Sequence, residues 1–199
     1  MNKIFKSMLI FLFLVPPTVS FAAKQKPLIV VLDWFINPNH APLFVAQQEG
    51  FFKQYGVEVE FVSPSDATQG EKMVAAGRAD VAITYQPSLV RYVTRGLPLV
   101  RFATLINTPL NCLVFLKNGR INSIKDLKGK RIGYSVLDID SMMLNEMLRE
   151  EKSNTKDVEM INVNFNLIQA LLTNRIDGFM GGMRNFEPLA IELEGKSAG

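Results

Sequence analysis

Cysteine, histidine and tryptophan each occur once in this 199-residue sequence, as Cys112, His40 and Trp34. A single cysteine excludes an internal disulfide, and a single histidine excludes any metal or catalytic site built from two histidines. No GxGxxG or Walker-type glycine motif is present, so no phosphate-binding loop of that kind is expected. These absences predict a protein with no resident cofactor and no bound metal.

Neither sign of charge predominates, because the chain has 22 basic and 19 acidic residues and a net charge of only +3. No basic stripe occurs, which argues against a nucleic-acid partner. Apolar residues make up 48% of the chain and charged residues 21%, as in a globular protein with a core. The length is generous for one domain and short for two.

Residues 1–23 have the pattern of a secretory signal peptide. Lys3 and Lys6 precede the apolar run Met8–Val15, and Ala22 offers a cleavage point. The run is far shorter than the ~20 apolar residues that span a bilayer, although an uncleaved anchor is the alternative. We therefore expect a soluble protein exported to the periplasm.

Short β-branched runs alternate with longer helical patterns in the rest of the chain. Strands are predicted at Leu28–Leu32, Val57–Val62, Asp80–Thr84, Lys130–Gly133, Val158–Val163 and Ile176–Met180. Helices are predicted at Pro42–Phe52, Asp66–Ala76, Pro87–Thr94, Ser123–Leu127, Ile139–Glu151, Phe165–Thr173 and Glu187–Leu193. This order predicts an α/β fold with parallel sheets.

The pattern divides into two halves of three strand–helix units each, residues 24–107 and 108–199. Two apolar runs, Leu99–Leu105 and Asn111–Leu116, follow each other with no helix between them. This arrangement suits an extended crossover between two lobes. A ligand cleft is then expected between the lobes, where the parallel strands end.

Four short motifs carry a resemblance to a known family. They are Val31-Leu32-Asp33-Trp34, Asn37-Pro38-Asn39-His40, Tyr85-Gln86-Pro87 and Arg184-Asn185-Phe186-Glu187. With them the chain resembles periplasmic binding proteins for thiamine pyrimidine precursors. The resemblance implies a type II-like periplasmic binding protein, a monomer with two α/β lobes that supplies an ABC permease in the inner membrane. Its ligand would be a hydroxymethylpyrimidine or a formylaminopyrimidine.

The same superfamily contains a synthase that makes the pyrimidine from pyridoxal phosphate and histidine. By alignment from Asp80, the positions of that enzyme's lysine and histidine hold Thr84 and Ser88 here. We therefore expect a binding protein and not an enzyme. A site for an alkyl sulfonate, nitrate or riboflavin is the other alternative, although an anion site would want arginine and only Arg184 is placed for it.

Two aromatic residues at strand ends are candidates for ligand stacking. Trp34 follows the first strand, and an electron-poor aminopyrimidine would stack well on its indole. Tyr85 ends the third strand and could complete a sandwich with Trp34. The alternatives are a core tryptophan and a tyrosine whose hydroxyl ties down the following helix.

Polar candidates complete the expected site. Glu187 could accept hydrogen bonds from an aminopyrimidine, or simply favour the start of a helix. Gln86 and Asn37 offer amide groups for ring nitrogens, and His40 is expected to line the cleft unless backbone contacts satisfy it. Asn185 could touch ligand or cap a helix. Tyr134 and Ser135 end a strand of the second lobe and should face the cleft.

The C-terminal stretch Gly195–Gly199 is small and polar, with no strand leading back to the first lobe. Binding proteins of the resembled family return to complete that lobe. We therefore expect a truncated chain, with exposed apolar surface on the first lobe and poor stability in isolation.

Overall fold

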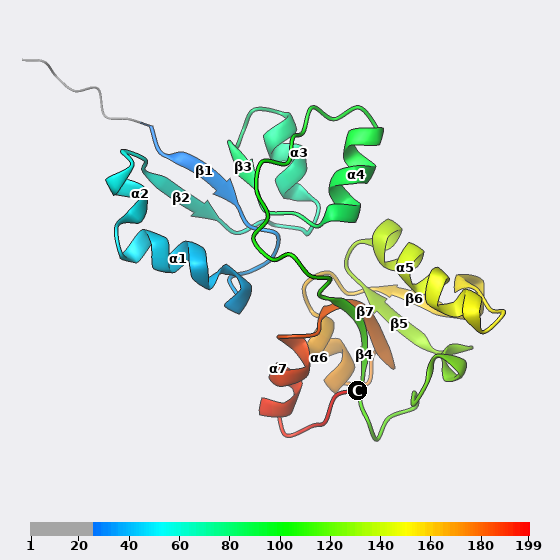
Figure 1. The fold of residues 1–199 in the computed structure, drawn as a ribbon. Coiled ribbons are helices and arrows are strands. Elements are labelled where there is room, and N and C mark those ends of the chain that lie inside the picture. The colour runs from blue at the N-terminus through cyan, green and yellow to red at the C-terminus, as the bar shows by residue number, and fades with distance from the viewer. Residues whose placement is uncertain (1–25) are drawn as a thin grey trace, which may run out of the picture.

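A computed structural model describes residues 26–199, and the predicted signal peptide lies outside them (Figure 1). The fold is α/β, as predicted, with two separate sheets. We call the elements from β1 to α4 the first lobe and those from β4 to α7 the second lobe. No helix of residues 26–199 combines the length and apolar character needed to cross a membrane.

The first lobe is built on a parallel sheet with strand order β2-β1-β3. The strands are β1 (Leu28–Val31), β2 (Val59–Val62) and β3 (Val81–Ala82). The helices are α1 (Ala41–Gln48), α2 (Phe51–Gln54), α3 (Gln69–Ala75) and α4 (Gln86–Thr94). A short 3₁₀ turn, η1 (Pro38–His40), precedes α1.

Packing in the first lobe is uneven. Phe61 of β2 contacts the rings of Phe44 and Phe52, at centroid distances of 5.0 and 6.2 Å. Gly70 lets α3 approach the other face so closely that an added Cβ would lie 3.1 Å from the Cβ of Ala82. By contrast, neither α1 nor α2 contains a fully buried residue. Large apolar side chains are exposed along the lobe and the crossover, among them Val45, Phe51, Val100 and Phe102.

The second sheet has the order β4-β7-β5-β6. Its strands are β4 (Asn111–Phe115), β5 (Arg131–Tyr134), β6 (Glu159–Asn162) and β7 (Gly178–Met183). The prediction of purely parallel sheets is wrong here, because β4 runs antiparallel to β7. The reason lies in the crossover: β4 enters from the first lobe with no helix to turn the chain back, so it starts where its neighbours end.

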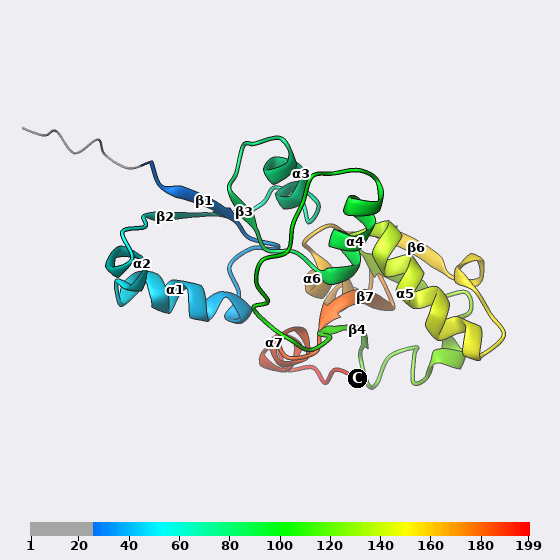
Figure 2. The same cartoon turned by 45° about the horizontal axis from the view of Figure 1, so that its top comes forward.

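Helices cover both faces of the second sheet (Figures 1 and 2). On one face, α5 (Leu137–Glu150) packs Leu144 and Leu148 in a cluster with Met180. On the other, α6 (Leu167–Leu172) and α7 (Glu187–Leu193) pack around Phe179, which is fully buried. The 3₁₀ turns η2 (Ile124–Leu127) and η3 (Thr155–Asp157) complete the lobe.

Several predicted boundaries need correction. The helix expected at Pro42–Phe52 is interrupted at Gly50, whose φ of 73° ends α1 before α2 begins. The helix expected at Asp66–Ala76 begins only at Gln69, because the Asp66 carboxylate accepts the Thr68 N–H and holds a turn there. The apolar run Leu99–Leu105 forms neither helix nor strand, which fits the extended crossover expected there.

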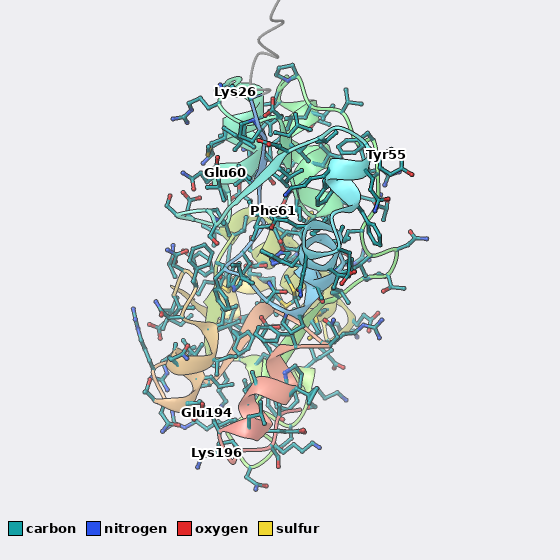
Figure 3. All side chains as sticks on the ribbon, turned by 90° about the vertical axis from the view of Figure 1, so that its left-hand side faces the viewer. Lys26, Tyr55, Glu60, Phe61, Glu194 and Lys196 are labelled. Carbon is teal, nitrogen blue, oxygen red and sulfur yellow. The ribbon has the colours of Figure 1, made fainter. Side chains whose placement is uncertain are left out.

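The two lobes lie end to end. Lys26 and Tyr55 mark one end of the molecule, and Glu194 and Lys196 mark the other (Figure 3). The crossover runs between the lobes, and α4 lies beside α5 in both ribbon views (Figures 1 and 2). The carboxyl ends of β1, β3, β5 and β7 therefore point toward the junction between the lobes.

Candidate ligand site between the lobes

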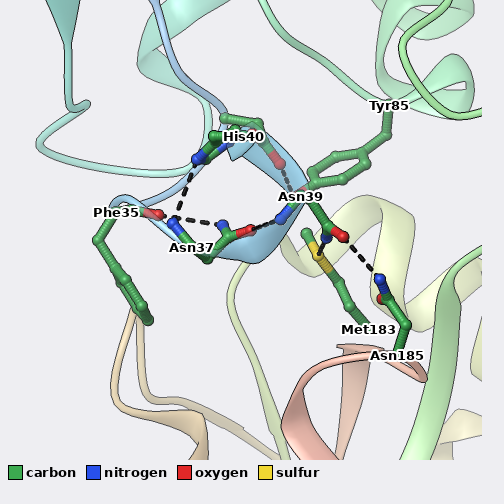
Figure 4. A network of polar contacts seen from close by, with 8 residues as sticks. Phe35, Asn37, Asn39, His40, Tyr85, Met183 and Asn185 are labelled. Carbon is green, nitrogen blue, oxygen red and sulfur yellow. Dashed lines mark hydrogen bonds and ion pairs between the residues drawn. The ribbon is translucent and has the colours of Figure 1, made fainter. Parts of the chain in front are cut away.

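The loop after β1 is held together by a buried histidine (Figure 4). His40 is 1% exposed, and its Nε2 lies 2.7 Å from Oδ1 of Asp33. Its Nδ1 accepts the backbone N–H of Asn37 at 3.3 Å. The ring proton must therefore sit on Nε2, so His40 is the neutral tautomer that donates to Asp33. Both ring nitrogens are used within the loop.

The side chain of Asn37 also forms its hydrogen bonds within this loop. Its side-chain oxygen accepts the N–H of Asn39 at 2.9 Å, and its amide nitrogen donates to the carbonyl of Phe35 at 3.0 Å. This pattern caps the 3₁₀ turn η1. The side chains of Asn37 and His40 therefore form hydrogen bonds within their own loop, as in the alternative to ligand contact that the sequence left open for His40.

Tyr85 extends this network to the third strand. Its hydroxyl donates to Oδ2 of Asp33 at 2.5 Å, so the Asp33 carboxylate links His40 and Tyr85. Burial, followed by the negative charges of Asp33, Glu187 and Asp140, raises the pKa of Tyr85 well above its usual value. Tyr85 therefore stays protonated, surrounded by carboxyl groups from both lobes.

Asn39 carries the network to the second lobe (Figure 4). Its amide nitrogen lies 2.8 Å from Sδ of Met183, and its side-chain oxygen accepts the amide of Asn185 at 2.7 Å. Asn185 is exposed, and its described hydrogen bond joins the lobes and does not cap α7.

Trp34 also bridges the lobes. It is 6% exposed and belongs to the core cluster of the second lobe, although it follows β1 of the first. Its ring meets Phe165 edge to face, with centroids 4.5 Å apart, and Phe35 at 5.8 Å. Phe35 contacts Phe186 in turn at 6.4 Å. Four aromatic rings thus gather at the junction.

A pocket of about 410 Å³ lies against this aromatic cluster. It brings together two of the predicted site residues, Trp34 and Glu187. The rest of its lining is Phe35, Phe165, Asn166, Leu167, Ile168, Gln169, Phe186 and Ala190. Among these residues Glu187 is the single charged one and none is basic.

The other predicted site residues lie outside that lining. Tyr85 is partly buried and bonds to Asp33 of the same network, whereas Gln86 is exposed at the start of α4. Tyr134 ends β5 and is partly buried, and Ser135 donates its hydroxyl to the carbonyl of Asn164 at 2.5 Å. No Trp34–Tyr85 ring contact occurs, so the expected sandwich of these two rings is not formed in this arrangement.

Glu187 is the most distinctive group of the pocket. It is 4% exposed, and its Oε2 accepts the N–H of Met183 at 2.7 Å. Burial raises the pKa of Glu187 to about 7, and the charge of Asp33 adds to the effect against the opposing backbone N–H groups. Near neutral pH this carboxyl can therefore both donate and accept a hydrogen bond.

Asp140 is a second buried carboxyl close to the junction. Its Oδ2 accepts the backbone N–H groups of Ser135 and Val136, both at 3.0 Å, and so holds the turn that starts α5. Burial raises the pKa of Asp140 to about 6. A Cβ at Gly181 would lie 2.7 Å from Oδ1, so this carboxyl fits only beside a glycine.

Sequence reasoning overlooked several of these groups. Asp33 lies inside the Asp-Trp motif but carries no site prediction, and nothing in the local sequence marks Phe165 as a partner of Trp34. Only the buried position of Asp33 directly after an apolar strand could have signalled its role. Among residues 26–199, no three His, Cys, Asp or Glu side chains gather where they could hold a metal ion.

A larger groove of about 920 Å³ lies within the second lobe, between β4 and α5. Its floor is largely apolar, with Met142, Met143, Met147 and Met180. Because it touches one lobe only and offers few polar groups, it does not match a cleft that closes on a small polar ligand.

The motifs and this geometry agree with a family comparison. The profile of the "NMT1/THI5 like" family matches residues 37–199. The chain belongs to this NMT1/THI5-like family. It is 45% identical over 172 residues to a Haemophilus influenzae protein provisionally named for thiamine biosynthesis, covering 86% of this chain and 54% of that protein.

Further relatives of the NMT1/THI5-like chain carry two kinds of name. The formylaminopyrimidine-binding protein of Halalkalibacterium halodurans is 30% identical over 196 residues, covering 97% of this chain and 59% of that protein. A 4-amino-5-hydroxymethyl-2-methylpyrimidine phosphate synthase of Schizosaccharomyces pombe is 30% identical over 149 residues, covering 75% of this chain and 43% of that protein. The chain spans about half the length of the curated relatives it matches.

Solved structures show the fold. The alkanesulfonate-binding protein SsuA of Xanthomonas axonopodis bound to MOPS superposes with a TM-score of 0.63 at 17% identity, covering 89% of this chain and 61% of that one. An ancestral arginine-binding protein bound to arginine superposes with a TM-score of 0.59 at 17% identity, covering 89% of this chain and 79% of that one. The fold is therefore that of type II periplasmic binding proteins, as the sequence predicted.

Proposed function

We propose that this protein binds a thiamine pyrimidine precursor, of the hydroxymethylpyrimidine or formylaminopyrimidine type, between its lobes. One observation carries the proposal: the single tryptophan and a buried carboxyl, Trp34 and Glu187, line the same pocket. The indole supplies a flat surface for the pyrimidine ring. In its ionised form the carboxyl can accept hydrogen bonds from the exocyclic amine and from a protonated ring nitrogen, and such charge-assisted bonds are the strong ones.

Charge favours a pyrimidine over an anionic ligand. No basic side chain lines the pocket, and three carboxyl groups, those of Asp33, Asp140 and Glu187, influence the neighbouring Tyr85. Arg184, the one arginine considered for an anion, turns its Nε to the carbonyl of Pro109 at 3.1 Å. A sulfonate or nitrate would lack a counter-charge here and would meet negative charge instead.

Binding without chemistry is the second part of the proposal. The residues at the positions of the synthase lysine and histidine are engaged otherwise: Thr84 donates its hydroxyl to Glu71, and Ser88 is buried in α4. Neither can form a Schiff base or transfer an imidazole nitrogen. The synthase names among the relatives make the enzyme the rival candidate.

The wider proposal follows from the family and the fold. Residues 24–107 and 108–199 form the two lobes, and residues 1–23 direct the chain to the periplasm. The protein acts as a monomer and delivers its ligand to the permease of an ABC importer in the inner membrane. Ligand shifts the lobes from an open to a closed arrangement.

Isothermal titration of the purified protein tests the ligand. The two pyrimidines should give saturable heats, whereas an alkyl sulfonate, nitrate and riboflavin should give none. Heat with the sulfonate alone would overturn the assignment. Formation of pyrimidine phosphate on incubation with pyridoxal phosphate would establish the synthase instead.

A further inference from the structure

Two charged helix ends meet across the junction, away from the pocket lining. Arg91 lies in the last turn of α4 in the first lobe and Arg95 caps the carboxyl end of that helix, whereas Asp138 lies in the first turn of α5 in the second lobe. Nη2 of Arg91 forms an ion pair with Oδ2 of Asp138, and Nη2 of Arg95 lies 3.7 Å from the same oxygen. Both ribbon views place these helices side by side (Figures 1 and 2).

This ion pair is built differently from an ordinary surface pair. The Arg91 side chain is only 24% exposed, and its Nε is buried with no hydrogen-bond partner among residues 26–199. A buried unpaired N–H is unfavourable, so the guanidinium is not ideally satisfied where the lobes touch. The ion pair nevertheless holds the end of α4 in the first lobe against the start of α5 in the second.

The position of Asp138 also connects it with the candidate site. Asp140 is two residues further along α5, and its carboxyl holds the Ser135 and Val136 N–H groups that start the helix. The ion pair of Asp138 with Arg91 therefore holds the same first turn of α5 that positions Asp140. Neither Arg91 nor Asp138 lines the pocket, so their effect must pass through lobe closure.

We propose that Asp138, held by Arg91 and Arg95, is a positioning residue that latches the two lobes together and slows ligand release. This rests on the proposed binding function. Removing the latch leaves every pocket contact in place but makes the closed arrangement less populated. The apparent affinity then falls by the loss of closed population, and the loss appears mainly in the dissociation rate.

The test compares Asp138→Asn, which removes the charge, with Asp138→Glu, which keeps it. Glu146→Gln is the matched control, because Glu146 pairs with Arg149 at 3.0 Å on the same helix but within one lobe. Dissociation of hydroxymethylpyrimidine is followed by stopped-flow fluorescence of Trp34, the only tryptophan. We expect Asp138→Asn to release ligand roughly two- to tenfold faster, and the other two variants to stay near wild type.

Two further measurements, the salt dependence of ligand release and small-angle scattering without ligand, test the latch separately from the proposed binding function. Added salt should speed release from wild type but not from Asp138→Asn, because only the former has a pair to screen. Without ligand, small-angle scattering should give Asp138→Asn a larger radius of gyration than wild type and Glu146→Gln. Equal radii and equal release rates would overturn the latch. If no pyrimidine binds any variant, the proposed function fails, and the scattering comparison still decides the latch.

Discussion

Trp34 and Phe165 meet edge to face with ring centroids 4.5 Å apart, although one follows the first strand of the first lobe and the other lies in the second lobe. The contact places the indole in the core of the opposite lobe while one side of it lines the pocket. The lining of the candidate pocket and the contact between the lobes therefore share one side chain. A ligand that stacks there would be sensed by both lobes at once.

Replacing Trp34 by phenylalanine separates the two roles. Phenylalanine keeps an aromatic ring against Phe165 but offers a smaller face to a pyrimidine. We expect affinity for hydroxymethylpyrimidine to fall about three- to tenfold, measured by titration calorimetry. Phe44→Leu, an aromatic change between α1 and β2 in the first lobe, is the control and should leave affinity unchanged. An unaltered affinity in Trp34→Phe would remove Trp34 from the site.

His40 should matter for stability. Replacing it by alanine leaves the Asp33 carboxylate and the Asn37 N–H without their buried partner. The expected loss is about 2–4 kcal/mol of unfolding free energy, measured by urea denaturation. Gln86→Ala, at an exposed position, should change it by less than about 0.5 kcal/mol. Equal stability of the two variants would contradict the buried network.

Gly181 is predicted to tolerate no side chain. Its φ is 84°, and an added Cβ would lie 2.7 Å from the Asp140 carboxylate. Gly195 is the matched control, because its φ of 73° is similar but nothing lies within 4 Å of its Cβ position. Gly195→Ala should cost about 1–2 kcal/mol from backbone strain alone, and Gly181→Ala clearly more. Equal costs in thermal unfolding would show that the Asp140 contact is unimportant.

Stability should fall as pH rises through the neutral range. Burial raises the pKa of Asp140 to about 6 and that of Glu187 to about 7, above their ordinary values of 3.8 and 4.5. At a pH between the ordinary and the raised pKa of each group, the folded protein holds a proton that the unfolded chain has released. The stabilisation is therefore complete below about pH 4 and is lost as pH rises through 6 and 7.

Variants identify the groups responsible for that pH dependence. Glu187→Gln and Asp140→Asn should each flatten the decline in melting temperature between pH 5 and about 7.5. Asp177 should act in the opposite sense, because its hydrogen bonds with Arg131 lower its pKa and its contribution is lost on acidification. A profile of Glu187→Gln parallel to wild type would rule out titration of Glu187 in this range.

The α/β class and most strands could be predicted because fully apolar runs such as Leu28–Leu32 permit little else. Glu187–Leu193 was predicted with its exact bounds, since Pro188 and the preceding turn fix its start. The direction of β4 could not be predicted, because it depends on where the crossover enters the second lobe. The first predicted helix was expected to end near Gly50, and the positive φ of Gly50 does separate α1 from α2 there, although Phe51 and Phe52 belong to the second helix.

The candidate site could be predicted only in part. Strand-end position indicated Trp34 and Tyr85, and the structure places Trp34 in the pocket lining and Tyr85 in the hydrogen-bond network with Asp33. The neutral state of His40 and its use of both nitrogens depend on an N–H three residues away, which spacing alone does not reveal. The roles of Phe165 and Asp138 arise from contacts between the lobes, and no local pattern encodes those.

Quenching of Trp34 fluorescence by hydroxymethylpyrimidine, in wild type and in Glu187→Gln, tests the pairing of these two residues most directly. Glutamine keeps the size of the side chain but cannot form a charge-assisted bond. We expect saturable quenching in both proteins, with an affinity at least about tenfold weaker in Glu187→Gln. No quenching in wild type, or equal affinity in the two proteins, would contradict a pyrimidine site built from Trp34 and Glu187.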